Sequence, residues 1–233
     1  MILSKFNRQL KSQNWLGVIL DFLVVVIGIF VALQAADWNQ SRLDQKEESY
    51  QLQFLYEELI NNENTYQIEL KEYQDILKKS FTASTLLTKD SWQPEHRKQF
   101  EQSIFSLFSF WGASFRPVSL RRLIDGGKLD LIKSKPIQNA ILQFENAYLE
   151  AIEQTKYSYG SSMVVTPQIT ASLIFDGMNI VSTDKELLSN QRLRGVVRDK
   201  AVLQRIQIDT LSKLQKERKK LIEILEPFVK TIQ

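Results

Sequence analysis

The pattern of apolar and polar positions divides the chain into two different parts. Residues 15–36 read WLGVILDFLVVVIGIFVALQAA, an apolar run with two polar side chains in its interior, the first of them Asp21. At about 1.5 Å per residue, a helix of this length covers about 30 Å, the thickness of the hydrocarbon core of a bilayer. Trp15 and Trp38 bracket the run, as aromatic rings do at the two membrane–water interfaces. The sequence therefore predicts a transmembrane helix over residues 15–38.

A cleaved secretory signal peptide and a buried helix of a soluble protein are the alternatives to a membrane anchor. The basic residues Lys5, Arg8 and Lys11 suit a signal peptide, but no small-x-small pattern closes the run at a cleavage position. The pattern favours an uncleaved anchor. More basic residues precede the run than closely follow it, which favours a cytoplasmic N-terminal segment and a chain whose bulk lies outside.

Asp21 is a costly residue inside a bilayer. A charged carboxylate that faces lipid costs about 2.5–3.5 kcal/mol on insertion scales, so we expect Asp21 to be protonated, to reach toward the interface, or to face protein or water. On a helix, Gly17, Gly28, Ala32 and Ala35 lie within about 40° of Asp21. Small residues let a second helix approach closely, although they are also common in membrane helices without such a role. The acid on the same face favours a partner helix, either in a second copy or in a larger membrane complex.

Beyond the apolar run, the pattern predicts helices almost throughout. No glycine occurs between Gly28 and Gly112, and apolar residues recur at spacings of three, four and seven up to about Thr88. We expect the membrane helix to continue without interruption to that point. A capping pattern at Thr183 opens a second long amphipathic stretch that reaches Pro227.

Prolines and glycines predict shorter helices between the two long ones. These helices run from Pro94 to Trp111, from Pro117 to Ile124, from Pro136 to about Gly160, and from Pro167 to Gly177. The β-leaning patches, Val164–Val165 and Ile180–Val181, are too short to carry a sheet. The predicted fold class is all-α, with an N-terminal transmembrane helix that continues into an elongated, antiparallel helical bundle.

The charge distribution favours pairing of the two long helices. Residues 37–90 hold 11 acidic and 6 basic side chains, a net charge of −5, and residues 184–233 hold 7 acidic and 12 basic side chains, a net charge of +5. Exposed ion pairs add only about 0–1 kcal/mol each. In an antiparallel arrangement the basic run of the last helix returns toward the membrane and can contact anionic headgroups, although a solvated helix face explains it equally well. The candidate headgroup contacts are Lys216, Arg218, Lys219 and Lys220.

Composition argues against an enzyme. The chain has 0 Cys and 1 His, which excludes thiol nucleophiles, disulfides and zinc sites built from these residues. The single histidine, His96, lies beside no metal-ligand motif, so we expect a surface residue. The neighbouring carboxylates of Glu57 and Glu58 point apart on a helix, which is typical of a solvated face rather than an acid–base pair. A net charge of +3 is too small to indicate nucleic acid. We expect no catalytic, cofactor or metal site.

A family resemblance begins at Asp21 and continues through Val25-Val26-Ile27-Gly28-Ile29, Ala32-Leu33-Gln34 and Trp38-Asn39. These residues resemble the opening of a family of uncharacterised bacterial single-span membrane proteins, which typically carries a glutamate in place of Asp21. A weaker match covers Arg116-Pro117 and residues 123–132. The resemblance implies an N-terminal anchor and a helical domain, and it implies no activity.

Two functions remain open. In the first, residues 1–14 are cytoplasmic, residues 15–38 span a bacterial inner membrane, and residues 39–233 form a periplasmic helical domain that serves as a scaffold or accessory subunit. In the second, the bundle is an extracytoplasmic sensor that binds a ligand at the aromatic segment 100–115. Only 14 residues precede the apolar run, too few for a cytoplasmic output domain, which favours the first.

Overall fold

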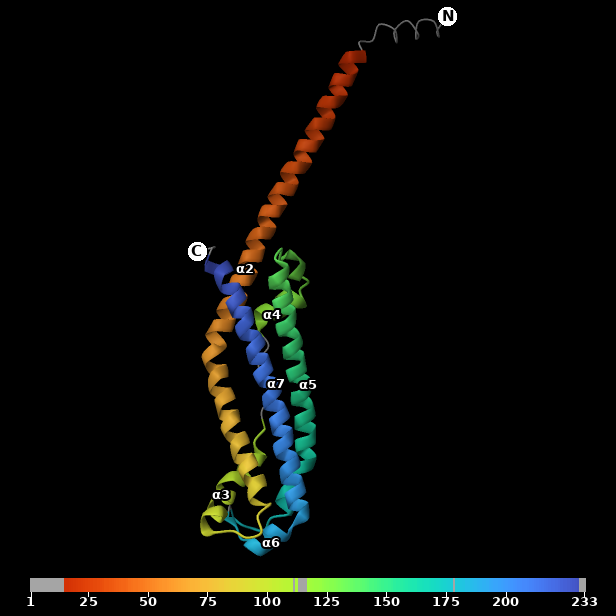
Figure 1. Ribbon diagram of the computed structural model, residues 1–233. Helices are drawn as coiled ribbons and strands as arrows, with labels where there is room; N and C mark the ends of the chain where they lie inside the picture. Colours follow the sequence, from red (N-terminus) through yellow and green to blue (C-terminus); the bar gives the residue numbers. More distant parts are fainter. Residues whose placement is uncertain (1–14, 111, 113–116, 178, 231–233) are drawn as a thin grey trace, which may run out of the picture. The chain divides into compact units, whose positions relative to one another are not determined.

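The computed structural model describes residues 15–110, 112, 117–177 and 179–230. These residues are helical almost throughout, which confirms the all-α prediction (Figure 1). The chain divides into two compact units, residues 1–49 and residues 50–233. The predicted cytoplasmic segment 1–14 lies outside the described residues.

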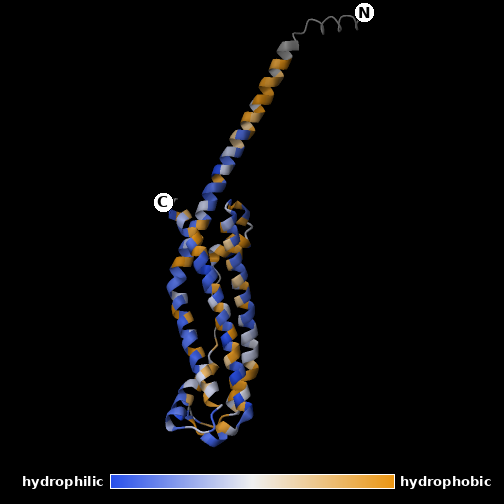
Figure 2. Cartoon of the chain, viewed as in Figure 1, coloured by the Kyte–Doolittle hydropathy of each residue, from blue (hydrophilic) through white to orange (hydrophobic). Residues whose placement is uncertain are grey.

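Helix α2 is one continuous helix over Trp15–Leu86, 72 residues long. It confirms the predicted continuation of the apolar helix and ends two residues before Thr88. Most of its apolar part is coloured orange, and the colour changes to blue where the polar residues begin (Figure 2). The uninterrupted helix follows from the sequence, because no proline occurs before Pro94 and no glycine between Gly28 and Gly112.

Two further long helices complete the bundle: α5 over Lys135–Ala171 and α7 over Gln191–Lys230. Figure 1 shows them running side by side with the part of α2 that follows Tyr50. Apolar residues at helical spacing on each of the three helices are buried between them. The bundle therefore has its hydrophobic core along its axis, divided into two clusters.

The first cluster, the Leu87 core, joins the end of α2 to the start of α7. Its members are Ala83, Leu86, Leu87, Phe100, Ile104, Leu107, Ile169, Leu173, Ile180, Leu187, Leu193, Val197 and Ala201. The second cluster, the Leu52 core, joins a more N-terminal part of α2 to the end of α7. Its members are Leu52, Leu55, Leu59, Leu120, Leu123, Ile132, Ile137, Ala140, Ile141, Phe144, Leu221 and Leu225. Because the start of α7 packs on the end of α2, the two helices are antiparallel, as predicted.

Short elements close the two ends of the bundle. At the Leu87 core lie α3 (Pro94–Ile104), the 3-10 helix η1 (Phe105–Phe108), the hairpin β1–β2 (Phe175–Asp176 and Asn179–Ile180) and α6 (Asp184–Ser189). At the Leu52 core lie α4 (Val118–Ile124) and the 3-10 helix η2 (Leu129–Leu131). The hairpin pairs Phe175 with Ile180 in an antiparallel register, and it turns through Gly177 at φ 60°.

The structure corrects the prediction that Pro167 starts a new helix. Helix α5 instead continues past Gly160 and Pro167 and ends at Ala171. A proline inside a helix costs about 3 kcal/mol because it removes a hydrogen bond and crowds the preceding turn. The continued helix brings Ile169 into the Leu87 core, where it is fully buried. Tertiary packing therefore outweighs the local cost near the helix end.

Two more predicted boundaries were wrong, and one pair of residues with β propensity lies in a helix. The helix that starts at Pro94 ends at Ile104 and tightens into η1 before the predicted end at Trp111. The last long helix is interrupted at Asn190, which has ψ 89° and separates α6 from α7. The predicted β-leaning pair Val164–Val165 is helical, because it belongs to α5.

Candidate functional site in the middle of the bundle

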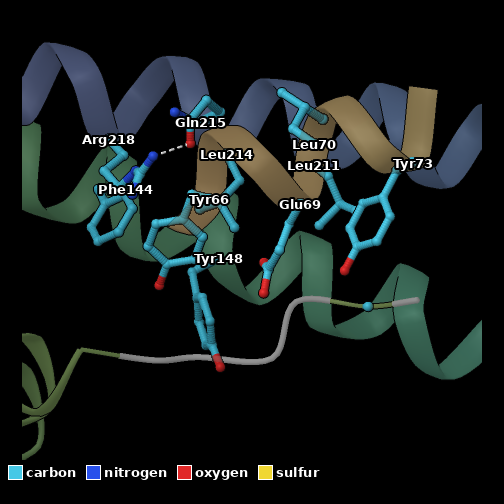
Figure 3. Close-up of a pocket in the computed structure, with 11 residues that line it drawn as sticks. Tyr66, Glu69, Leu70, Tyr73, Phe144, Tyr148, Leu211, Leu214, Gln215 and Arg218 are labelled. Carbon is cyan, nitrogen blue, oxygen red and sulfur yellow. Dashed lines mark hydrogen bonds between the residues drawn. The ribbon is translucent and has the colours of Figure 1, made fainter. Parts of the chain in front are cut away.

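Between the two hydrophobic cores, α7 places an arginine inside the bundle. The Arg218 side chain is 3% exposed, and its Nη2 lies 2.8 Å from a carboxylate oxygen of Glu63 on α2. The guanidinium carbon stacks over the ring of Tyr66, 3.9 Å from its centroid. Arg218 also donates a hydrogen bond to Gln215 (Figure 3). Gln215 in turn donates to Glu63 at 3.2 Å. Arg218 and these partners form the central polar site.

Helical spacing explains how two elements supply this site. Glu63 and Tyr66 are three residues apart on α2, and Gln215 and Arg218 are three residues apart on α7, so each pair shares a helix face. Arg218 also lies four residues after Leu214 and three before Leu221, within the apolar stripe of α7. Its side chain therefore points into the bundle. There the buried positive charge needs an acid to pair with, and the aliphatic and planar parts of the side chain pack on an aromatic ring.

Burial changes the ionisation of both partners of the stack. It lowers the pKa of Arg218, an effect that the nearby Glu63 and Tyr66 oppose. Burial raises the pKa of the Tyr66 hydroxyl to about 12, and the positive charge of Arg218 partly opposes this rise. At neutral pH the site therefore holds a neutral phenol against a paired guanidinium and carboxylate.

A small cavity adjoins the central polar site. It has a volume of about 40 Å³ and lies between α2, α5 and α7, where Tyr66, Glu69, Tyr73 and Tyr148 line it with Arg218. Figure 3 shows the oxygens of the three tyrosines and Glu69 turned to the same side. A space of this size holds about three water molecules, far below the roughly 300–1,000 Å³ of pockets for organic ligands. The cavity is suited to hydration of the polar site.

A second buried cation lies closer to the Leu87 core. The residue Lys200 of α7 is 2% exposed and donates a hydrogen bond to the Ser162 hydroxyl of α5. Ser162 in turn donates to the backbone oxygen of Ser158 at 2.6 Å. Burial lowers the pKa of Lys200 to about 8. Sequence reasoning missed this lysine, although its spacing of three from Val197 placed it on the buried face of α7.

A third interaction that sequence reasoning missed involves Glu58. Its carboxylate accepts hydrogen bonds from the backbone N–H groups of Val118 and Ser119, each at 2.9 Å, and from the Ser119 hydroxyl at 2.5 Å. Glu58 thereby caps the first turn of α4 from another helix. The expectation that this glutamate belongs to a purely solvated face was wrong, because the cap comes from a residue 60 positions away in sequence.

The structure also corrects one of the predicted headgroup contacts. Arg218 faces Glu63 and Tyr66 inside the bundle and is not available to lipid. The remaining members of the run, Lys216, Lys219 and Lys220, are exposed. Lys220 pairs with Glu217 of its own helix at 2.7 Å. A role of the three lysines at headgroups stays a prediction.

The predicted contacts of the anchor lie on the N-terminal part of α2. Gly28, Ala32 and Ala35 are exposed, and Trp38 is 68% exposed with the Arg42 guanidinium 5.7 Å from its ring centroid. The backbone of Trp15, Gly17 and Asp21 is helical, while their side chains lie outside the described part. A helical backbone brings Gly17, Asp21, Gly28, Ala32 and Ala35 to one face, as the spacing predicts.

The aromatic segment 100–115 contributes mainly to the core in its described part. Phe100, Ile104 and Leu107 are fully buried in the Leu87 core, while Phe105 and Phe110 are each 37% exposed. Phe110 packs edge-on against Tyr159, with ring centroids 5.1 Å apart. This packing supports the predicted core rather than a ligand pocket. Among the described residues, no group of three side chains suited to a metal ion occurs.

Comparison with known protein families, curated proteins and solved structures finds no match to this chain. The resemblance to single-span membrane proteins at Asp21 and the residues that follow therefore stays a prediction. The functional interpretation rests on the chain itself.

Proposed function

We propose that this protein is a non-enzymatic membrane-anchored scaffold or accessory subunit, whose helical bundle is held by the apolar part of α2. One observation carries the proposal: every described side chain from Ile19 to Ala36 is exposed, including Val24 at 62% and Phe30 at 63%. Among the described residues, α2 is the helix long and apolar enough to cross a membrane. Exposed apolar surface costs about 25 cal/mol per Å² in water, and a lipid environment removes this cost.

The proposed orientation places the N-terminus in the cytoplasm and residues 39–233 on the periplasmic side of a bacterial inner membrane. It is supported by Lys5, Arg8 and Lys11, because basic residues near a membrane helix favour the cytoplasmic side. The bacterial assignment rests on the motif resemblance. Trp15 and Trp38 then lie at the two interfaces.

The face that carries Asp21 and the small residues is proposed to contact a second transmembrane helix. A Cβ built at Gly28 meets no atom within 4 Å, so this position is open to a neighbour. A second helix on this face would shield Asp21 from the acyl chains. The partner is a second copy of this chain or a helix of a larger membrane complex.

Membrane extraction and complex size test the proposal. The intact chain is expected to stay with the membrane after alkaline washing, and recovery in the soluble fraction would overturn the anchor. In mild detergent, Gly28→Leu is expected to break the complex because its side chain blocks helix approach. Val26→Leu, which lies roughly opposite Gly28 on the helix, is the matched control, and equal behaviour of the two variants would refute the packing face.

A further inference from the structure

The segment from the last turn of α4 to the first residue of α5 carries an excess of positive charge. Residues 121–135 hold 5 basic side chains and 2 acidic ones, a net charge of +3, equal to that of the whole chain. Four of the basic residues are exposed and Lys128 is half-buried. Together the five form the basic end surface: Arg121, Arg122, Lys128, Lys133 and Lys135.

Packing holds the basic end surface in a defined place. Leu123 and Ile132, which flank the turn, are buried in the Leu52 core. The chain reverses at Gly127, whose φ of 64° is readily adopted by glycine. The guanidinium carbon of Arg122 lies 5.3 Å from the ring centroid of Phe54 on α2. The charges therefore sit on a rigid part of the bundle, beside the start of its α2 segment.

The short segments that close the opposite end of the bundle are electrically neutral. Residues 89–101 hold 3 basic and 3 acidic side chains, and residues 176–199 hold 4 of each. These two segments form the elements around the Leu87 core. The segment that closes one end of the bundle is thus basic, whereas the short segments that close the other end are neutral.

Chain connectivity decides which end stays near the membrane. Ala36 ends the apolar run and Tyr50 begins the bundle, so 13 residues lie between them. That tether reaches about 50 Å at full extension and about 21 Å as a helix. Tyr50 is two residues before Leu52, the first member of the Leu52 core. The tether therefore keeps the end that carries the basic end surface within reach of lipid headgroups.

We propose that the basic end surface binds anionic lipid headgroups and holds the bundle against the membrane. This inference rests on the proposed function, because it needs α2 to be an anchor. Anionic lipid surfaces attract cations over about one Debye length, which is about 8 Å at physiological salt. Each Lys or Arg at such a surface changes the ratio of bound to free bundle by about fivefold. A neutral bundle end offers no such attraction.

The absence of cysteine in the sequence makes a site-specific test direct. The full chain carries one fluorophore at Asn139→Cys, near the basic end, or at Gln191→Cys, near the neutral end; both positions are exposed. Each protein is placed in nanodiscs of phosphatidylcholine alone or with one third phosphatidylglycerol, and a nitroxide on the lipid headgroups quenches the label. We expect stronger quenching at Asn139→Cys in anionic discs, lost at high salt, and no change at Gln191→Cys.

Two variants with the same change in net charge test whether the extra quenching in anionic discs comes from the basic end surface. The variant Arg121→Gln, Lys133→Gln, Lys135→Gln is expected to lose the extra quenching at Asn139→Cys, with the bound-to-free ratio reduced about fivefold for each cation. Lys89→Gln, Lys98→Gln, Lys185→Gln changes the net charge equally at the neutral end and is expected to have no effect. Equal quenching in both discs, or equal loss in both variants, would overturn the inference. Failure to enter nanodiscs would instead refute the proposed anchor.

Discussion

Arg218 and Glu63 form an ion pair across the bundle, with Nη2 and the carboxylate oxygen 2.8 Å apart. The two side chains differ in their access to water, since Arg218 is 3% exposed and Glu63 is 28% exposed. A loss of the carboxylate therefore harms the pair more than a loss of the guanidinium. The arginine would remain buried without a counter-charge, whereas the glutamate can reach solvent.

Glu63→Gln is expected to lower the free energy of unfolding by about 3–5 kcal/mol, the usual cost of an uncompensated buried charge. Arg218→Met, which keeps most of the volume, is expected to cost less. Denaturant unfolding of the intact chain in mild detergent measures both. The control is Glu226→Gln, whose partner Lys230 is 71% exposed, with an expected change of about 0–1 kcal/mol. Equal losses in Glu63→Gln and the control would contradict the role of burial.

Glu58→Gln is expected to weaken the start of α4, because the neutral amide replaces a charged acceptor for two backbone N–H groups. The expected loss of stability is about 1–2 kcal/mol, as for helix caps in general. Hydrogen exchange of the amides of Val118 and Ser119 should accelerate. Glu57→Gln is the matched control, since the exposed Glu57 makes a hydrogen bond to Gln53 within its own helix. Similar exchange in both variants would show that the cap is unimportant.

Gly112→Ala is expected to destabilise the protein by about 1–3 kcal/mol, because the new Cβ would lie 2.1 Å from Thr155 Cγ2. The second substitution Thr155→Ala removes that methyl group and should restore part of the stability. Gly160→Ala is the control within α5, where a Cβ meets no atom within 4 Å. It should raise stability by about 0.4–1 kcal/mol through lower chain entropy of the unfolded state. Thermal unfolding compares the three variants, and a loss in Gly160→Ala equal to that in Gly112→Ala would refute the steric cause.

Stability should depend on pH through Lys200, whose pKa falls from 10.5 in the unfolded chain to about 8 in the folded one. Between pH 8 and 10.5 the unfolded state binds more protons, so the free energy of unfolding should rise with pH. The total rise is about 3 kcal/mol, of which little is gained below pH 8. Lys200→Met should be more stable at neutral pH.

The comparison of Lys200→Met with the natural chain isolates this effect from the remaining groups that titrate in the same range. Unfolding is measured at intervals from neutral pH to about pH 10, the range over which a lysine deprotonates. The difference in stability between the two proteins should shrink as the pH rises. A constant difference would mean that Lys200 has an ordinary pKa in the folded protein.

The local sequence pattern predicted α2 well, because helix breakers and apolar spacing act within a few residues of each other. The absence of proline before Pro94 and of glycine between Gly28 and Gly112 was enough to predict one helix that ends near Leu86. The local pattern gave a wrong prediction at Pro167. There the cost of a proline inside the helix is outweighed by the burial of Ile169 in a core built from distant segments.

The charged residues show the same difference between what the local pattern predicts and what long-range packing decides. Arg218 lies in a run of basic residues that suggested a lipid contact, yet its spacing from Leu214 and Leu221 placed it on the apolar stripe of α7. The spacing was therefore a usable signal for burial. The partner was not readable from the sequence, because Glu63 is 155 positions away and meets Arg218 only when α2 and α7 are antiparallel.

The sequence by itself determined the apolar segment of α2, the helical class and the antiparallel direction of the two long helices, since these depend on hydrophobic pattern and on the opposite net charges of the two long helices. Only the tertiary structure decided which charges are buried and which stay exposed. Glu58 became a cap, Arg218 and Lys200 entered the interior, and four of the five cations of residues 121–135 remained exposed. The physical reason is that burial depends on which helix faces meet, a property of long-range packing rather than of neighbouring residues.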